Sequence, residues 1–405
     1  MAHEQSAAAR LDLPRRPSRG LARVPVLSYG FRPFFMGGAL WAAIAMPLWL
    51  GLITGQLEFA SSYGAVAWHA HEFLFGYVSA IVAGFLLTAV PNWTGRLPVR
   101  GGALLALFAV WATGRVALLL VDQIGVVAAT TADSLFLPVL AAVVLREIVA
   151  GNNWRNAKVA VLISLLATAN IGFHVEVIVA GMADYALRAG IAVVVGLIML
   201  IGGRITPSFT RNWLAGQGAK RLPVPFARFD VAAIAASLSA LLLWVALPDS
   251  QLAAAALVGA GFVQVFRLSR WVGASTWREP LVLVLHAGYA FLPLGFLLVG
   301  AGILWPTMVP ASALLHAWTA GMVGLMTLAV MTRASLGHSG RTLTANIGTQ
   351  AIYFAVALAA LSRIAAAFFG DWMNTMPTFS AVAWTAAFTG FVFLYGPMLL
   401  RHKQA

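Results

Sequence analysis

The chain contains a short motif, Trp68-His69-Ala70-His71-Glu72, in which three ionisable side chains stand within about one helical turn. An apolar run begins at this motif and continues through Val90. Ionisable side chains are costly inside a bilayer and usually mark a functional site there. Neutral imidazole is a common protein ligand of iron and copper. The motif therefore indicates a metal-binding or redox site at the head of a hydrophobic segment.

The composition places this motif in a membrane protein. Of 405 residues, 61% are hydrophobic and only 10% are charged, which is too apolar for an ordinary soluble domain. The chain has no cysteine, which excludes disulfides, thiolate-bound zinc, cysteine-held iron–sulfur clusters and covalently attached haem. The net charge of +13 lies in the connections between apolar runs and forms no basic stripe interleaved with aromatics, so no nucleic-acid partner is expected.

The apolar runs define the elements that must position the motif. A membrane-spanning helix needs about 20 largely apolar residues. By this measure we expect an all-α polytopic membrane protein with about twelve transmembrane helices, in a single domain over 26–405 that follows a basic cytoplasmic segment, 1–25. The predicted spans are 29–54, 65–90, 102–121, 130–149, 159–180, 187–204, 230–247, 252–268, 280–303, 310–332, 345–368 and 378–400.

The charge pattern predicts that both termini are cytoplasmic. With that orientation nearly all arginines and lysines fall on the inner side, as the positive-inside rule requires, including those of the long connection Arg204–Asp230. Only Arg115, Arg188 and Arg363 fall toward the outer side. The acidic residues of the connections lie outside, namely Glu58, Asp122, Asp133, Asp184, Asp249 and Asp371.

This topology sorts six histidines into two levels. His69, His71, His174 and His316 fall near the outer ends of their spans, together with Glu72 and Glu176, whereas His286 and His338 fall toward the inner side. A single histidine in a span is often only a hydrogen-bonded residue between helices. Six of them, clustered in depth, favour metal ligands, with Glu72 and Glu176 as catalytic proton donors or as partners of the ligands.

Helical geometry predicts how the motif is divided. At about 100° per residue, His69 and His71 point to nearly opposite faces and should serve different centres, while His69 and Glu72 share a face. Gly76, two turns below His69, would let a flat macrocycle approach the backbone. The inner pair, His286 and His338, would hold a second haem.

Arginines beside aromatic residues, proline or asparagine lie near the inner side. Such residues suit a clamp for haem propionates or a site for anionic head groups, and ordinary positive-inside anchoring is the alternative for each. The candidate cofactor-binding residues are Arg32, Arg96, Arg204, Arg211, Arg333 and Arg341, with Tyr289 as a hydrogen-bond donor three residues after His286.

Several stretches resemble the NnrS family from about residue 26 to the C-terminus. They are GFRPFF at 30–35, WHAHE at 68–72, AGFLLTAVPNWTGR at 83–96, PSFTRNWL at 207–214, HAGYAFLPLGF at 286–296 and AVMTRASLGHSGR at 329–341. The resemblance implies a multi-pass protein of the bacterial inner membrane that binds haem and copper and takes part in nitric oxide metabolism or the response to nitrosative stress.

Two functions remain open at this stage. The first is an oxidoreductase that reduces NO to N2O at histidine-held metals, with one or two b-type haems, copper or another second metal, and electrons from quinol or another donor. The second is a non-enzymatic haem and copper protein that binds NO as a sensor or buffer. A metal or haem transporter is disfavoured, because few polar residues lie at mid-depth. A monomer and a homodimer both remain open.

Overall fold

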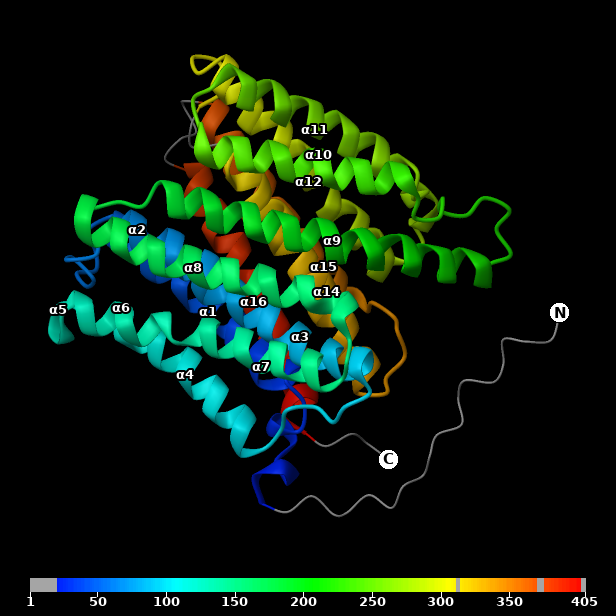
Figure 1. Ribbon diagram of the computed structural model, residues 1–405, viewed down its shortest axis with the longest axis horizontal. Helices are drawn as coiled ribbons and strands as arrows, with labels where there is room; N and C mark the ends of the chain where they lie inside the picture. The colour runs from blue at the N-terminus through cyan, green and yellow to red at the C-terminus, as the bar shows by residue number, and fades with distance from the viewer. Residues whose placement is uncertain (1–19, 311–313, 370–374, 402–405) are drawn as a thin grey trace.

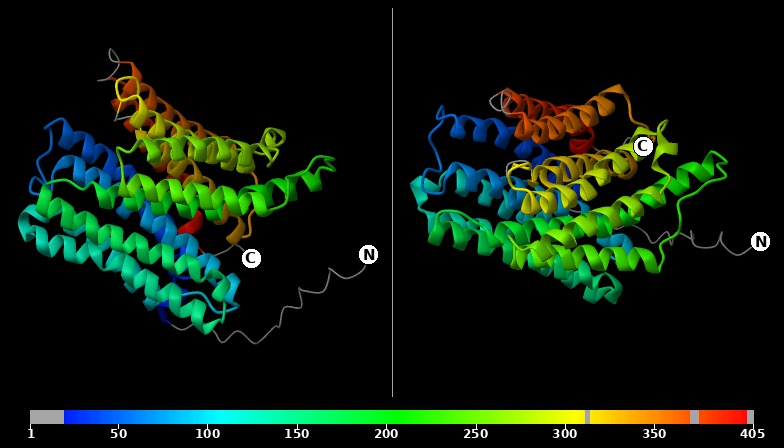
Figure 2. Two further views of the ribbon diagram at one scale, coloured as in Figure 1. Left: turned by 45° about the horizontal axis from the view of Figure 1, so that its top comes forward. Right: turned by 90° about the horizontal axis from the view of Figure 1, so that it is seen from above.

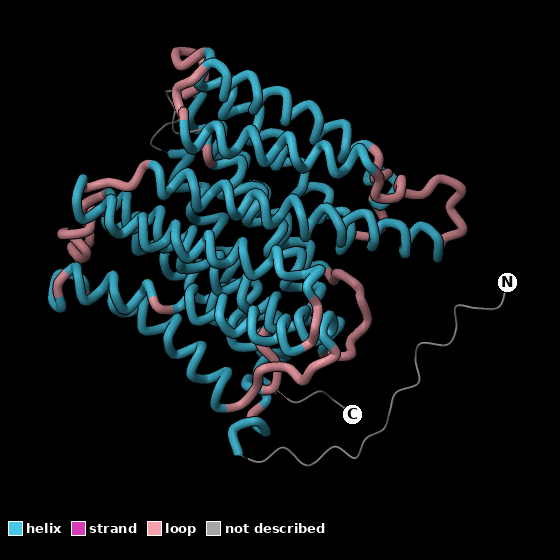
Figure 3. The backbone as a smooth tube through the Cα atoms, in the orientation of Figure 1, coloured by secondary structure: helices cyan, strands magenta, loops and turns pink. Residues whose placement is uncertain are grey.

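The computed structural model describes residues 20–310, 314–369 and 375–401. Most of the predicted N-terminal segment, 1–25, lies outside these ranges, and so does Asp371. Within them all regular structure is helical, with loops between the helices (Figure 3). The expectation of an all-α fold is confirmed.

Twelve helices of the described chain are long and apolar enough to cross a membrane, which confirms the predicted number. They are α1 (Phe31–Ile53), α2–η3–α3 (Ala65–His71, Glu72–Tyr77, Val78–Thr94), α4 (Gly102–Leu119), α6–α7 (Val126–Ser134, Phe136–Ala150), η4–α8 (Trp154–Asn156, Ala157–Ala180), α9 (Tyr185–Gly216), α10 (Arg228–Ala246), α11 (Gln251–Ser269), α12 (Pro280–Leu304), η6–α14 (Ala317–Met322, Val323–His338), α15 (Ile347–Phe368) and α16 (Thr375–Leu400). Short helices η1 (Gly20–Arg23), η2 (Pro25–Leu27), α5 (Val121–Ile124) and η5 (Gly273–Thr276) lie between them.

The helices form one elongated bundle whose loops gather at two ends (Figures 1 and 2). We call the end that holds η1 and the last turn of α16 the terminal end, and the end where α1 joins α2 the distal end. Helices adjacent in sequence pack as neighbours, as α10 and α11 or α15 and α16 do. The first and last spans, α1 and α16, also pack together, so the chain closes on itself.

The span α2–η3–α3 lies at the centre of the bundle. Of its most apolar stretch 78% is buried by protein, against 33% for α10, which lies on the outside. The π-helical segment η3 interrupts it directly after the motif, and a second π-helical segment, η6, directly follows His316. A π-helical turn has one residue more than an α-helical turn and often occurs at functional sites. Both of these turns adjoin histidines singled out by the sequence.

Helix α9 differs from the expectation, because the predicted connection after Arg204 continues as a helix to Gly216. Its 32 residues correspond to about 48 Å, more than the roughly 30 Å of a hydrocarbon core. Pro207 is accommodated within it. The segment 204–216 is too polar to be predicted as part of a membrane span, yet a helix needs no apolar residues once it has left the bilayer. The extension projects at the terminal end (Figure 1).

The predicted orientation can be tested directly, because the chain has no cysteine of its own. Single cysteines at two exposed loop positions, Glu58→Cys at the distal end and Gln217→Cys at the terminal end, place one label on each side. A membrane-impermeant maleimide should label Glu58→Cys from the outside and Gln217→Cys only in inverted vesicles. The opposite labelling pattern would reverse the orientation given above.

Candidate metal centre

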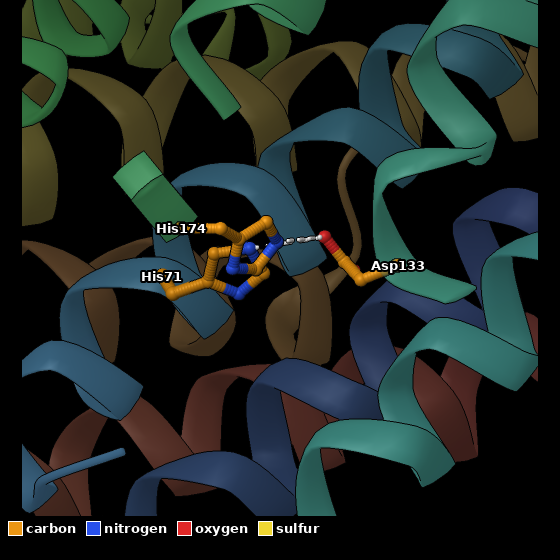
Figure 4. Close-up of side chains that lie close together, drawn as sticks. All are labelled: His71, Asp133 and His174. Atoms are coloured by element: carbon orange, nitrogen blue, oxygen red, sulfur yellow. Dashed lines mark hydrogen bonds and ion pairs between the residues drawn. The ribbon is translucent and has the colours of Figure 1, made fainter. Parts of the chain in front are cut away.

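Three buried side chains from three different spans meet near the distal end. They are His71 of α2, Asp133 of α6 and His174 of α8 (Figure 4), and each offers one ligand atom within 4.8 Å of the others. His71 Nε2 lies 3.1 Å and His174 Nε2 2.9 Å from the same oxygen, Asp133 Oδ2. Two imidazole nitrogens and a carboxylate oxygen are a donor set suited to a first-row transition metal.

The second nitrogen of each ring has its own partner. His71 Nδ1 lies 3.1 Å from Glu72 Oε1, and His174 Nδ1 lies 2.8 Å from the Tyr63 hydroxyl. Asn170 donates to Asp133 Oδ2 at 2.9 Å, and its carbonyl oxygen lies 2.8 Å from His71 Nε2. Metal-binding histidines commonly donate their remaining N–H to a carboxylate or another oxygen, which fixes the ring and its tautomer. The surroundings of both rings match that pattern.

The surroundings of His71 are satisfied only if a cation is present at its ring. Its Nδ1 faces Glu72, and its Nε2 faces Asp133 and the amide oxygen of Asn170, so only acceptor oxygens surround the ring nitrogens. A neutral imidazole has a single N–H, and its other nitrogen presents a lone pair. One nitrogen would then face a carboxylate without a hydrogen, which is unfavourable. A metal ion at Nε2, or a second proton, removes this conflict.

The charges of the cluster lead to the same requirement. Arg115 of α4 bridges two buried carboxylates, with Nη1 2.6 Å from Glu72 Oε2 and Nη2 bonded to Asp133 Oδ1. One guanidinium opposes two carboxylates, which leaves one formal negative charge. Burying an unbalanced charge is costly, so the cluster favours one further cation. The residues present therefore fit a bound metal ion.

The distal loop before α2 is fixed in place by Asp122. The carboxylate accepts hydrogen bonds from the backbone N–H groups of Ser61 and Ser62, at 2.8 and 2.9 Å, and from the Ser62 hydroxyl at 2.6 Å. The Ser62 bonds lower the pKa of Asp122, because they favour its charged form. The loop in turn holds Tyr63 against His174.

His69 points away from this cluster into a separate cavity of about 240 Å³. His316 lines the same cavity, and so do Trp49, Phe73 and Arg363. The His69 ring stacks on Trp49 with ring centroids 4.2 Å apart, and His69 Nδ1 is buried without a partner among the described residues. Most of the remaining lining is aliphatic or aromatic. Two imidazoles, flat walls and a cation that can pair with a carboxylate are the features that non-covalent haem needs.

The prediction that His69 and His71 serve different sites agrees with this geometry, but the predicted places of Glu72 and Gly76 are wrong. Glu72 lies with His71 and Arg115 and does not share the side of His69, because the helix widens into η3 at Glu72 and the spacing of 100° per residue ends there. Gly76 gives no room to a macrocycle. A Cβ at Gly76 would collide with the Arg115 guanidinium, so this glycine makes space for the ion pair.

Glu176, the other predicted proton donor, contacts neither site among the described residues. Its carboxylate accepts the backbone N–H of Asp184 at 2.6 Å and that of Ala186 at 3.1 Å. These N–H groups belong to the start of α9, where a carboxylate is stabilised by the unpaired donors and the helix dipole. The contacts of Glu176 are those of a helix cap.

The two inner histidines have different neighbours. His286 is buried, its Nε2 lies 2.7 Å from the Thr210 hydroxyl, and its Nδ1 has no partner in the described chain. His338 is exposed at the end of α14 and lies against the rings of Tyr29 and Phe31. No described contact joins the two rings, so the structure does not bring this pair together.

Five of the seven predicted cofactor-binding residues have protein partners among the described residues, namely Arg32, Arg96, Arg211, Arg333 and Tyr289. Arg32 donates to the carbonyl of Leu399 at 2.9 Å, at the end of α16, and to that of Arg401 at 2.8 Å, directly after it, and so ties α1 to α16. Arg96 pairs with Glu147 at 2.6 Å, and the Tyr289 hydroxyl accepts a hydrogen bond from Arg267 at 2.8 Å.

The other four predicted arginines differ in their surroundings. Arg333 lies over the Phe209 ring, and Arg341 is exposed. Arg204 and Arg211 line a pocket at the terminal end.

Four residues of the cluster are not among the site residues predicted from the sequence, namely Tyr63, Arg115, Asp133 and Asn170. Two of them had a usable signal. Asp133, counted above with the acidic residues of the connections, falls within the predicted span 130–149, and the structure places it in α6. Arg115 is one of three arginines that violate the charge bias. An acid and a base that both fall near the outer ends of apolar spans are natural partners, since neither is stable there alone.

The fold and the site together define a multi-pass helical membrane protein with a buried cluster of histidine and carboxylate groups whose donor atoms are placed to suit a metal ion. A family model described as NnrS protein matches residues 25–403, and the chain belongs to this family. A search of the curated proteins finds no match.

The cluster predicts a strong dependence of stability on Arg115. In Arg115→Met the carboxylates of Glu72 and Asp133 stay buried without their cation, and the free energy of unfolding should fall by about 3–5 kcal/mol. Denaturant unfolding of the purified protein in detergent measures this. The exposed Arg341→Met is the control and should change little. Equal effects of the two substitutions would contradict the assigned role of Arg115.

Proposed function

We propose that this protein is a nitric oxide reductase of the bacterial inner membrane. The reaction is 2 NO + 2 electrons + 2 protons → N2O + H2O, and a quinol is the expected source of electrons. One observation carries the proposal: His69 and His71, two residues apart, point into two adjacent sites of different chemistry, an apolar cavity and a charged cluster. Membership of the NnrS family supports it, since the resemblance implies haem, copper and nitric oxide.

In this proposal the apolar cavity holds a b-type haem. His69 or His316 would hold the iron, and the partnerless Nδ1 of His69 is available for that bond. Arg363 would pair with a propionate, and Trp49 and Phe73 would lie against the ring. When bound, the haem supplies redox-active iron. The aliphatic walls exclude water and admit NO, which is small and uncharged.

The second metal, copper by family resemblance, is assigned to His71, Asp133 and His174. Glu72 and Tyr63 would fix the ligand tautomers by accepting the N–H of His71 and of His174. Arg115 holds Glu72 and Asp133 in position through its two amino groups. Two adjacent metal sites suit a reaction that must join two NO molecules, because holding both reactants removes much of the entropic barrier.

The sensor or buffer function also has one supporting observation. The cavity alone fits that function, because one imidazole, of His69 or of His316, is enough to hold a haem iron, and the aliphatic walls would admit NO without any second metal. Neither function uses Glu176, His286 or His338, because these residues lie at neither site.

Substitutions at His69 and His71 test whether the cavity and the charged cluster bind different groups. His69→Ala should change the haem absorption spectrum while the second metal is retained. His71→Ala should remove the second metal, as measured by elemental analysis, with the haem spectrum largely unchanged. Gln123→Ala, exposed at the distal end, is the control. If both histidine variants lose the same haem and nothing else, the assignment of two separate sites is wrong.

Turnover decides between the enzyme and the binding protein. The purified protein, with haem and copper counted, is supplied anaerobically with a quinol and NO, and N2O is measured. We expect N2O from the unsubstituted protein and at most about a hundredth of that rate from His71→Ala, the loss typical when a catalytic metal site is disrupted. A fully metallated sample that binds NO without forming N2O would establish the sensor or buffer function instead.

A further inference from the structure

A pocket of about 400 Å³ lies at the terminal end, where the extension of α9 meets the loop 217–227. Three arginines line it. Arg204 and Arg211 come from α9, and Arg155 comes from η4, before α8. Arg204 and Arg211 are seven residues apart, which places them on one face of α9, and Ser208 between them also lines the pocket.

The pocket has an excess of positive charge. Within the described chain no carboxylate pairs with any of these three arginines, and Lys158 lies near enough to Arg155 and Arg204 to be repelled by both. One acid, Asp230, reaches the lining, but it is already occupied. It pairs with Arg267 at 3.2 Å and Arg270 at 3.3 Å, and it accepts the Ala227 N–H at 2.9 Å.

The loop that closes the pocket is held rather than free. Arg211 Nη2 donates to the Pro223 carbonyl at 2.6 Å, and the Val224 N–H donates to the Arg270 carbonyl at 3.1 Å. Pro223 and Pro225 restrict the backbone between these bonds. Guanidinium groups have five donors in a fixed fork, so Arg211 keeps donors for a ligand after this bond.

The position of the pocket along α9 indicates which kind of ligand it can bind. Arg204 is 19 residues beyond Tyr185, the first residue of α9, which is about 29 Å of helix and close to the thickness of a hydrocarbon core. The arginines therefore lie at the level of lipid head groups. The Phe226 side chain, 59% exposed, lies beside them and offers an apolar contact for an acyl chain.

We infer that this pocket binds the phosphate group of an anionic phospholipid through Arg155, Arg204 and Arg211. Guanidinium forks match phosphate oxygens in pairs, and basic pockets between spans at the membrane surface are typical sites for such lipids. The assignment is independent of the distal metal sites. Of the two roles that the sequence suggests for Arg204 and Arg211, it favours a site for anionic head groups over a propionate clamp.

Native mass spectrometry of the full-length protein tests the inference. The delipidated protein is titrated with phosphatidylglycerol, with phosphatidylcholine and with inorganic phosphate in separate arms. We expect retained phosphatidylglycerol, little phosphatidylcholine, and a loss of affinity of about thirtyfold in Arg204→Gln/Arg211→Gln. Competition by inorganic phosphate without selective lipid binding would make the ligand a soluble phosphate and overturn the lipid assignment.

Two further variants keep the result interpretable. Arg221→Gln removes an exposed arginine that follows α9 but does not line the pocket, and it should bind the lipid normally. Arg155→Gln removes a lining arginine from a different element, so its expected loss of about fivefold does not depend on the folding of α9. Equal loss in Arg221→Gln, or no loss in the other two variants, would show that the lipid is held only by general surface charge.

Discussion

The arrangement of the helices and side chains around the distal cluster depends on one buried guanidinium, that of Arg115. Arg115 binds Glu72 at the start of η3 and Asp133 in α6, so a single side chain connects three spans. Two glycines make this possible. A side chain at Gly76 would occupy the space of the guanidinium, and one at Gly114 would press on Asp133. The ion pairs also set the direction of the carboxylate oxygens, and these oxygens determine where the rings of His71 and His174 lie.

The two π-helical segments explain how one motif serves two sites. Each lies beside the cavity, with η3 contributing Phe73 and Tyr77 and η6 contributing Thr319. The Gly76 carbonyl in η3 accepts the Trp111 indole N–H at 2.9 Å and the Ser79 hydroxyl at 3.1 Å. An irregular backbone within a membrane span is tolerated only where such partners exist. The local cost of the π turn is thus offset by side chains of the surrounding bundle.

The sequence predicts the spans well because their signal is local. Twenty apolar residues and a charge bias suffice to place most helices to within a few residues. The exceptions are α9, which continues as a polar helix beyond Arg204, and the tenth span, which was predicted over 310–332 and is found at Ala317–His338. The sites are harder to predict, because they depend on which spans become neighbours. His71 and His174 were identified by residue type, yet no pattern in the chain says that Asp133 lies between them. The placement of Glu72 failed for a related reason, since the π turn depends on packing and not on propensity.

The lining of the cavity comes from both ends of the chain, which determines when the cavity forms during synthesis. His69 and Trp49 come from the first two spans, but Arg363, Ser380 and Trp384 come from the last two, and Arg32 joins α1 to the final carbonyls of α16. A ribosome delivers these parts at opposite ends of synthesis. The cavity is therefore enclosed only after the whole polypeptide has entered the membrane, so a prosthetic group bound there would be loaded late, from the bilayer or by a maturation step, rather than during translation.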